Sequence, residues 1–200
     1  ESIAGMSRAA EAFGIPIVSG NASLYNQSMD VDIFPTPIIG SLGLLEDVEK
    51  HATVGFKSEG DAIVLLGTDS TWDAIGGIAG SEYLELIQGK VEGQPSIDLD
   101  LEIRTQAVCR EAIAADLVAS GHDVSDGGVA VAIAESAIIG GLGAVIDESL
   151  GERWDAAMFG ESQSRILLSV SSDNVSAVEA LADASNVPMK VIGKVVGDSL

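Results

Sequence analysis

Residues 121–136, GHDVSDGGVAVAIAES, are the most informative part of the chain for the fold. Polar residues and a glycine pair lead directly into a run of alanine, valine and isoleucine, which is typical of a loop that opens a buried helix. We expect this helix over residues 127–139, with Asp126 capping its first turn through the carboxylate. The two glycines would let another segment pack closely against that turn.

Strand and helix patterns alternate on both sides of this stretch, and their lengths are typical of a compact domain. Together they predict an α+β fold, a sandwich in which helices cover one face of a sheet. The expected elements are strands at 61–67, 142–147, 165–171 and 188–195, and helices at 81–88, 99–120 and 173–185.

The first fifty residues carry a separate set of patterns. Apolar residues at three- and four-residue spacing predict a helix over residues 2–13 that ends at Gly14. The segments GIPIVSG, residues 14–20, and PTPIIGSLGLL, residues 35–45, are both predicted to be strands, and the first of them to be buried. Apolar density falls between residues 46 and 60, so we expect a domain boundary there.

Composition and charge limit the classes of function. A chain of 200 residues that is 46% hydrophobic can form one or two packed domains, and no apolar run approaches the roughly 20 residues of a membrane span. Acidic residues outnumber basic ones 31 to 10, which gives a formal charge of −21. Such a surface repels polyanions, so binding of nucleic acid through its phosphates is excluded.

The single cysteine, Cys109, cannot form an internal disulfide. Together with the lack of a targeting segment, this predicts a cytoplasmic protein. Cys109 lies in a helical pattern, where a buried and inert thiol is expected rather than a nucleophile.

The polar stretch SGNAS, residues 19–23, follows an apolar run and contains the parts of a phosphate or metal site. Gly20 leaves the backbone open to a phosphate, Asn21 offers the kind of oxygen that Mg²⁺ prefers, and Ser23 offers a hydroxyl. The same residues are also typical of a turn, so on this stretch alone both interpretations stay open.

Two further motifs are open to both a functional and a structural interpretation. His122 could be a base or a ligand, or His122 and Asp123 could simply close a helix and start a strand, and no other His or Cys lies at metal-ligand spacing. In MFGESQSRILLSV, residues 158–170, the residues before the strand could contact an anion or a ribose, or form a polar strand entry with an ion-paired arginine.

The order of the motifs is more specific than any one of them. PIVSGNASLYNQS, PTPIIGSLGLLEDV, GFKSEGD, HDVSDGGVAVAIAE and FGESQSR, in this order, closely resemble the synthetase component of the formylglycinamide ribonucleotide amidotransferases, or phosphoribosylformylglycinamidine synthases. These enzymes are related to aminoimidazole ribonucleotide synthetase. The resemblance runs essentially from end to end and matches the later part of a much longer chain, so we expect this sequence to be a fragment.

The resemblance implies an ATP-dependent carbon–nitrogen ligase of purine biosynthesis that uses ATP and Mg²⁺. Such an enzyme phosphorylates the amide oxygen of formylglycinamide ribonucleotide, and ammonia released from glutamine then displaces phosphate to give the amidine. The implied partners are a glutaminase subunit or domain and the N-terminal half of the same chain. A second copy of the fragment is an alternative partner for its apolar edge.

By position in the family, Gly20 would contact ATP, Asn21 would ligate magnesium and Ser23 would contact the ribonucleotide substrate. The triplet Glu161, Ser162 and Gln163 would contact substrate or an auxiliary nucleotide. No catalytic residue is assigned, because neither histidine matches the family's catalytic motif, and the fragment alone is expected to be inactive.

The resemblance also implies the domain identities. Residues 1–50 would be the C-terminal part of the second nucleotide-binding subdomain, and residues 56–200 the synthetase C-terminal-like α/β domain, truncated at its end. Two other classes stay open: a kinase-like enzyme of the same fold, such as selenophosphate synthetase or thiamine phosphate kinase, and a non-catalytic binding or assembly module. SLYNQS and FGESQSR argue against the kinases.

Overall fold

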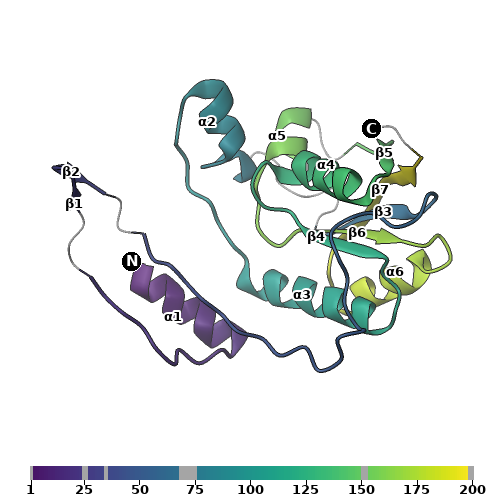
Figure 1. Cartoon of the computed structure of the whole chain (residues 1–200), viewed down its shortest axis with the longest axis horizontal. Helices are drawn as coiled ribbons and strands as arrows, with labels where there is room; N and C mark the ends of the chain where they lie inside the picture. The colour runs from purple at the N-terminus through teal and green to yellow at the C-terminus, as the bar shows by residue number, and fades with distance from the viewer. Residues whose placement is uncertain (1, 24–26, 34–35, 68–75, 150–152, 198–200) are drawn as a thin grey trace. The chain divides into compact units, whose positions relative to one another are not determined.

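The computed structural model describes residues 2–23, 27–33, 36–67, 76–149 and 153–197. The chain forms two compact units, Glu1–Val48 and Glu49–Leu200 (Figure 1).

The larger unit is built on a five-stranded antiparallel sheet with the strand order β4-β6-β3-β7-β5. The central strand β3 pairs Ala62 with Val170 of β6 on one side and with Lys194 of β7 on the other. The strands are β3 (Ala62–Leu66), β4 (Ser120–Asp123), β5 (Gly143–Ile146), β6 (Ile166–Val170) and β7 (Met189–Val196).

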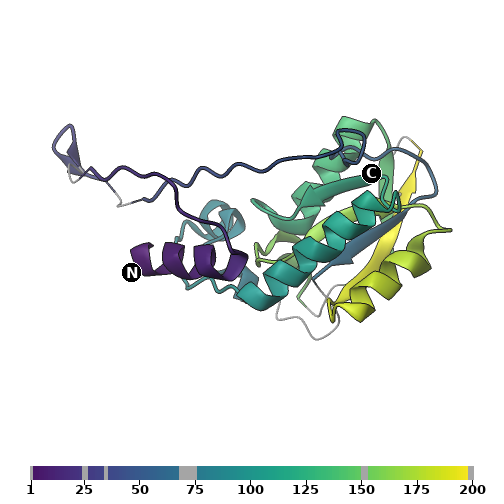
Figure 2. The same ribbon diagram turned by 90° about the horizontal axis from the view of Figure 1, so that it is seen from below.

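Helices cover both faces of this sheet (Figures 1 and 2). Helices α4 (Gly128–Gly140) and α5 (Trp154–Phe159) share a hydrophobic cluster with one face. Helices α3 (Leu99–Ala114) and α6 (Val175–Ala184) share a second cluster with the other face. The prediction that helices cover only one face is therefore wrong.

The sequence of β3 explains why both faces are covered. Ile63 and Leu65 belong to the cluster with α4 and α5, whereas Val64 and Leu66 belong to the cluster with α3 and α6. All four side chains are fully buried. An uninterrupted apolar run such as AIVLL is what a strand needs when neither of its faces meets water.

Helix boundaries follow local capping groups. The Ser81 hydroxyl accepts a hydrogen bond from the Leu84 N–H at the start of α2 (Glu82–Gln88), and the Asp98 carboxylate caps α3. Helix α3 ends at Ala114, because the chain turns at Asp116, which has a φ of +58°. The predicted helix over 99–120 is therefore too long, and Ser120 begins β4 instead.

The smaller unit contains α1 (Ser2–Phe13) and a short hairpin of β1 (Gln27–Ser28) and β2 (Val31–Asp32). The predicted helix and its end at Gly14, with φ +64°, are confirmed. No residue of α1 is buried.

The two strands predicted in this unit are wrong. The described residues of 14–20 and 35–45 form no strand, and Val18 and Ile38 are about nine-tenths exposed. A strand needs a ladder partner for its backbone groups, and the only ladder among the described residues of this unit joins β1 to β2.

No helix in the described ranges is long and apolar enough to cross a membrane. Cys109 lies on α3 against the second hydrophobic cluster, half-buried. Burial raises the pKa of its thiol, and the nearby Arg110 only partly opposes this, so the thiolate is disfavoured as the sequence predicts.

Candidate functional site

Two glycines shape the entry to α4 at one side of the site. Gly127 has φ +78° and Gly128 has φ +70°, a region that L side chains rarely adopt. A Cβ on Gly128 would lie 2.5 Å from the carbonyl oxygen of Gly160 and 2.7 Å from that of Met158. The first turn of α4 thus packs directly on the end of α5, which confirms the expected close packing at Gly128, whereas a Cβ on Gly127 would meet Val131 of α4 itself at 2.3 Å.

Glu161, and not Asp126, holds the start of α4. Its Oε1 accepts hydrogen bonds from the backbone N–H of Gly127 at 2.8 Å and from that of Glu82 at 2.9 Å. The Glu161 N–H itself donates to the carbonyl of Gly77 at 2.7 Å. The predicted cap by Asp126 is wrong, because the N-cap is Gly127 and the acceptor comes from a distant part of the sequence. One carboxylate therefore joins the beginnings of α2 and α4.

An aromatic contact also holds α2 to the sheet domain. Tyr83 of α2 stacks on Phe159 of α5 with ring centroids 5.1 Å apart, and Trp154 meets Phe159 edge-on at 6.2 Å. The short 3₁₀ helix η1 (Gly76–Ile78) lies beside the segment that follows α5, and a Cβ on Gly77 would lie only 2.3 Å from the Ser162 hydroxyl. Residues 76–88 are therefore attached to the 159–162 segment at several points.

Arg165 is a buried cation at the start of β6. Only 3% of the residue is exposed, and its Nε donates to the carbonyl of Ser162 at 3.1 Å while a terminal nitrogen donates to that of Gly160. Burial lowers the pKa of the guanidinium to about 10, and the Glu161 carboxylate opposes that shift. Because this pKa is well above 7, Arg165 remains charged at neutral pH.

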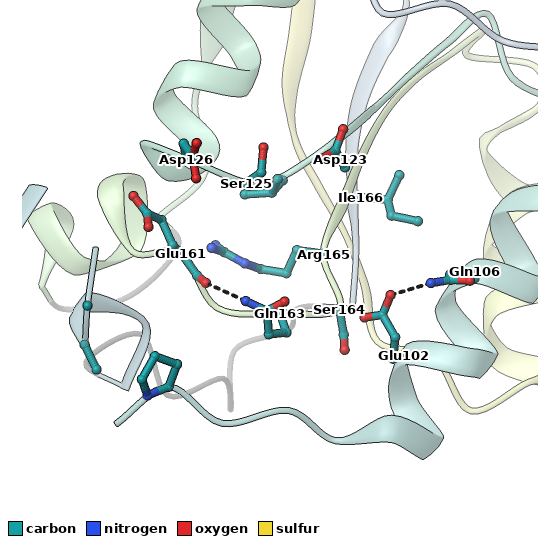
Figure 3. A pocket seen from close by; sticks show the side chains of 14 residues that line it. Glu102, Gln106, Asp123, Ser125, Asp126, Glu161, Gln163, Ser164, Arg165 and Ile166 are labelled. Atoms are coloured by element: carbon teal, nitrogen blue, oxygen red, sulfur yellow. Dashed lines mark hydrogen bonds between the residues drawn. The ribbon is translucent and has the colours of Figure 1, made fainter. Parts of the chain in front are cut away.

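These segments surround a cavity of about 560 Å³ between the entry to α4, the 161–166 segment and α3 (Figure 3). A second cavity of about 220 Å³ is lined by the end of β3, η1 and the residues before α3. Among the described residues, five line both cavities: Ala79, Pro95, Glu161, Gln163 and Ser164.

The lining of the larger cavity is predominantly acidic. Carboxylates come from Glu102 on α3, from Asp123 and Asp126 before α4, and from Glu161. Arg165 is the one basic residue among those described around either cavity. A ligand with exposed negative charge would therefore meet repulsion here unless a cation accompanied it.

Neutral hydrogen-bonding groups complete the lining of the larger cavity. Ser125 and Gln163 face the same space, and the Gln106 amide on α3 donates to the Glu102 carboxylate at 2.6 Å. The Gln163 amide donates to the Glu161 carbonyl at a longer 3.3 Å. Hydroxyls and amides of this kind suit polar, uncharged parts of a small ligand.

His122 lies between two carboxylates at the edge of the sheet. Its Nε2 is 2.8 Å from an oxygen of Glu135 on α4, and its Nδ1 is 3.3 Å from an oxygen of Asp123. His122 does not line either cavity, so its visible role is to link β4 to α4.

The residues predicted in the smaller unit lie on exposed, irregular backbone. Gly20, Asn21 and Ser23 are all exposed, and a Cβ built on Gly20 would meet no atom within 4 Å. No group of three or more His, Cys, Asp or Glu side chains in the described ranges could hold a metal ion. The structure therefore brings Glu161, Ser162 and Gln163 together at the cavities of the larger unit, and shows the SGNAS stretch as an open loop.

Several residues that line the cavities could not be identified from the sequence. Glu102 and Gln106 lie in an ordinary amphipathic helix, and no local signal marks them. Ser164 follows directly after the predicted triplet, but its φ of +66° and its burial are visible only in the structure.

Comparison with known proteins places this fold in a family. Residues 58–200 match the family described as AIR synthase related protein, C-terminal domain. The chain belongs to this family. The AIR synthase type of α/β sandwich predicted for these residues is thereby confirmed.

Relatives of this AIR synthase related chain extend the match to its whole length. It is 45% identical over 201 residues to the phosphoribosylformylglycinamidine synthase subunit PurL of Moorella thermoacetica, and 46% identical over 200 residues to that of Caldanaerobacter subterraneus. Each alignment covers 100% of this chain and 27% of the relative. The resemblance inferred from the motifs is confirmed, and the chain spans about a quarter of the length of these relatives.

Solved structures agree on the fold. "Structure of PurLQS from Thermotoga maritima" superimposes with a TM-score of 0.71 at 18% identity, covering 99% of this chain and 32% of the other. "T. maritima PurL complexed with FGAR" gives a TM-score of 0.63 at 22% identity, covering 75% and 26%.

Proposed function

We propose that this chain is part of the synthetase component of a phosphoribosylformylglycinamidine synthase, an ATP-dependent ligase of purine biosynthesis. The observation that carries the proposal is the 45% identity to a PurL subunit over the whole chain. Residues 1–50 would be the end of the second nucleotide-binding subdomain, and residues 56–200 the synthetase C-terminal-like α/β domain.

The chemical task of such an enzyme is to activate an amide. The amide oxygen of formylglycinamide ribonucleotide is a poor leaving group until ATP phosphorylates it, and ammonia from a glutaminase partner can then displace phosphate to give the amidine. The charge that develops on the transferred phosphoryl group must be stabilised by positioned groups. Such groups would have to come from several parts of the longer protein.

The SGNAS loop is the contribution that we propose for the smaller unit. The open space around Gly20 would let ATP approach the backbone, the Asn21 side chain would supply one oxygen ligand to Mg²⁺, and the Ser23 hydroxyl would contact the substrate. When bound, Mg²⁺ would neutralise phosphate charge. Among the described residues no group of three or more His, Cys, Asp or Glu could hold the ion, so its other ligands would have to come from elsewhere in the longer protein.

For the AIR synthase related domain of the larger unit, we propose that the cavities bind a ligand of the enzyme. A volume of about 560 Å³ is in the range of small-molecule sites, and it is bordered by the Glu161, Ser162 and Gln163 segment. We propose that it takes an auxiliary nucleotide or the substrate.

The test uses the full-length natural subunit supplied with MgATP, ammonia and formylglycinamide ribonucleotide, with ADP release as the readout. Asn21→Ala should lower turnover at limiting Mg²⁺ by about tenfold or more, with partial recovery at high Mg²⁺, because one ligand is lost. Ser7→Ala, an exposed position on α1, is the matched control and should leave turnover unchanged.

The 200-residue chain alone should release no ADP above background in the same assay. Unchanged turnover of the full-length Asn21→Ala variant at limiting Mg²⁺ would refute the role of this loop. Turnover by the 200-residue chain that Asn21→Ala abolishes would refute the proposal that other parts of the protein are required.

A further inference from the structure

The Glu161 carboxylate and the Arg165 guanidinium, which border the cavities, already form hydrogen bonds within the protein. Glu161 accepts from two helix amides, and Arg165 donates to the carbonyls of Ser162 and Gly160. The Ser162 hydroxyl lies against Gly77 so closely that a Cβ there would be 2.3 Å away. The residues that the motif suggests as ligand contacts are therefore largely engaged in holding the fold.

Ser164 differs from these neighbours. It is only 8% exposed, and its Oγ is buried without a hydrogen-bond partner among the described residues. An unsatisfied buried polar group costs about 1–3 kcal/mol. Its backbone φ of +66° adds strain that a non-glycine residue adopts only when the surroundings impose it. A buried hydroxyl held in this way indicates a partner that binds from outside the chain.

The position of Ser164 indicates where that partner binds. Ser164 lines both cavities, and Figure 3 shows its side chain pointing from the 161–165 segment toward the chain that precedes α3. The cavity on that side is lined by Gly67, Gly76 and Gly77. Gly67 packs directly on the segment that carries Ser164, where a Cβ would lie 1.7 Å from the Ser164 carbonyl oxygen. Because Ser164 lines both cavities, a ligand in the larger cavity that reaches Ser164 also reaches the border of the smaller one.

The charges around the smaller cavity limit the chemistry of that part of the ligand. No basic residue is among its described lining residues, and its carboxylates come from Asp98 and Glu161. Both carboxylates already accept hydrogen bonds from helix N–H groups. A phosphate would find no counter-charge there, whereas an uncharged hydroxyl or amine can both donate to and accept from a serine hydroxyl.

We propose that the Ser164 hydroxyl is a ligand contact, and that it hydrogen-bonds an uncharged hydroxyl or amine of a bound nucleoside at the junction of the two cavities. This inference rests on one part of the proposed function, namely that the cavity binds a nucleotide. It assigns a binding role to a residue outside the Glu161, Ser162 and Gln163 triplet.

The experiment measures local hydrogen–deuterium exchange of residues 161–165 in the full-length subunit, titrated with adenosine, MgADP or inorganic phosphate. In the wild-type protein adenosine and MgADP should slow exchange of this segment, and phosphate alone should not. Ser164→Ala should raise the half-saturating concentrations of adenosine and of MgADP about five- to tenfold, the value of one neutral hydrogen bond.

Two variants separate binding from folding. Ser164→Gly removes the hydroxyl but suits the positive φ, so it should bind as weakly as Ser164→Ala while remaining at least as stable as the wild type. Ser169→Ala removes a buried β6 hydroxyl that is paired with Ser120 at 2.7 Å, away from both cavities, so it should bind like the wild type.

Wild-type affinity in both Ser164 variants would overturn the inference, as would protection of the segment by phosphate alone. Absence of protection by adenosine and MgADP in the wild type would also overturn it. The proposed ligase function would then still be judged separately by the turnover of the Asn21→Ala variant.

Discussion

The two units of the chain contain similar apolar segments but use them differently. Helix α1 of the smaller unit buries none of its residues, whereas α4 of the larger unit buries Val129, Ala132, Ile133 and Ala137. The run PIIGSLGLL is exposed, whereas AIVLL lies at the centre of a sheet with its last four residues fully buried. The difference teaches that an apolar pattern shows a tendency to be buried, while a core also requires partners from distant parts of the sequence.

The largest effect should come from filling the contact between α4 and α5. Gly128→Val would place side-chain atoms on backbone carbonyls less than 3 Å away and force a β-branched residue to φ +70°, so the free energy of unfolding should fall by about 4 kcal/mol. Gly141→Ala is the control, because Gly141 has a similar φ but open space, and it should cost only about 1 kcal/mol. Urea unfolding measures both, and equal losses would show that backbone conformation alone requires glycine at residue 128.

A direct test of the comparison removes one leucine from each unit. Leu65→Ala should lower the free energy of unfolding of the 200-residue chain by about 3 kcal/mol, because it leaves a cavity in the core. Leu44→Ala removes a side chain that is 89% exposed and should change it by less than about 0.5 kcal/mol. Comparable losses from the two variants would mean that the smaller unit has a core of its own.

A smaller effect on stability is expected at Glu161, which borders the cavities and also holds the beginnings of two helices. Glu161→Ala should lower the free energy of unfolding by about 2 kcal/mol, since the N–H groups of Glu82 and Gly127 lose their acceptor. Glu161→Gln keeps an oxygen acceptor and should cost about half as much. Glu46→Ala, at an exposed acid of the smaller unit, should have no measurable effect. Thermal unfolding distinguishes these cases, and no loss in Glu161→Ala would show that its two bonds do not stabilise the fold.

The smallest effect should be dependent on pH. Burial raises the pKa of Asp61 above its ordinary value of 3.8, and its Oδ2 is buried without a hydrogen-bond partner among the described residues. A folded-state pKa above the unfolded value means that stability falls as pH rises from 3.8 through the folded pKa. Asp61→Asn should therefore gain under about 1 kcal/mol at pH 7 relative to the wild type and lose this advantage below pH 3.8. Stability curves from pH 3 to 7 test this, and a difference independent of pH would contradict it.

Elements with a clear apolar pattern in their own residues could be predicted from the sequence. The strand at 61–67 and the helices at 81–88 and 173–185 correspond to β3, α2 and α6 to within about two residues at each end. Strand β4 has no such signal, because SGHD contains no apolar residue and is a strand only through its pairing with β6. The start of a strand at His122 and Asp123 was therefore only one of two open interpretations. The short helix α5 was missed for a similar reason, since six residues are too few for a clear periodicity.

The candidate site was predictable in composition but not in geometry. The motif FGESQSR marks the correct segment, yet nothing in it shows that the Glu161 carboxylate reaches the N–H groups of two helices. The expected cap by Asp126 was a reasonable local choice that a residue far along the chain replaced. Ser164 has an ordinary sequence context, and its significance depends on burial and on a backbone angle that are set by tertiary contacts.

The position of β3 in the sheet has a consequence for synthesis and folding of the chain. Its residue Ala62 pairs with Val170 and Lys194, each more than a hundred residues further along. During translation the most apolar strand of the sheet therefore emerges before either of its neighbours. Until β6 and β7 have been made, AIVLL has two open edges and two uncovered faces, which favours slow closure of the sheet and association with other unfolded chains. Synthesis of β6 and β7, rather than the emergence of any early segment, is then the event that allows this sheet to close.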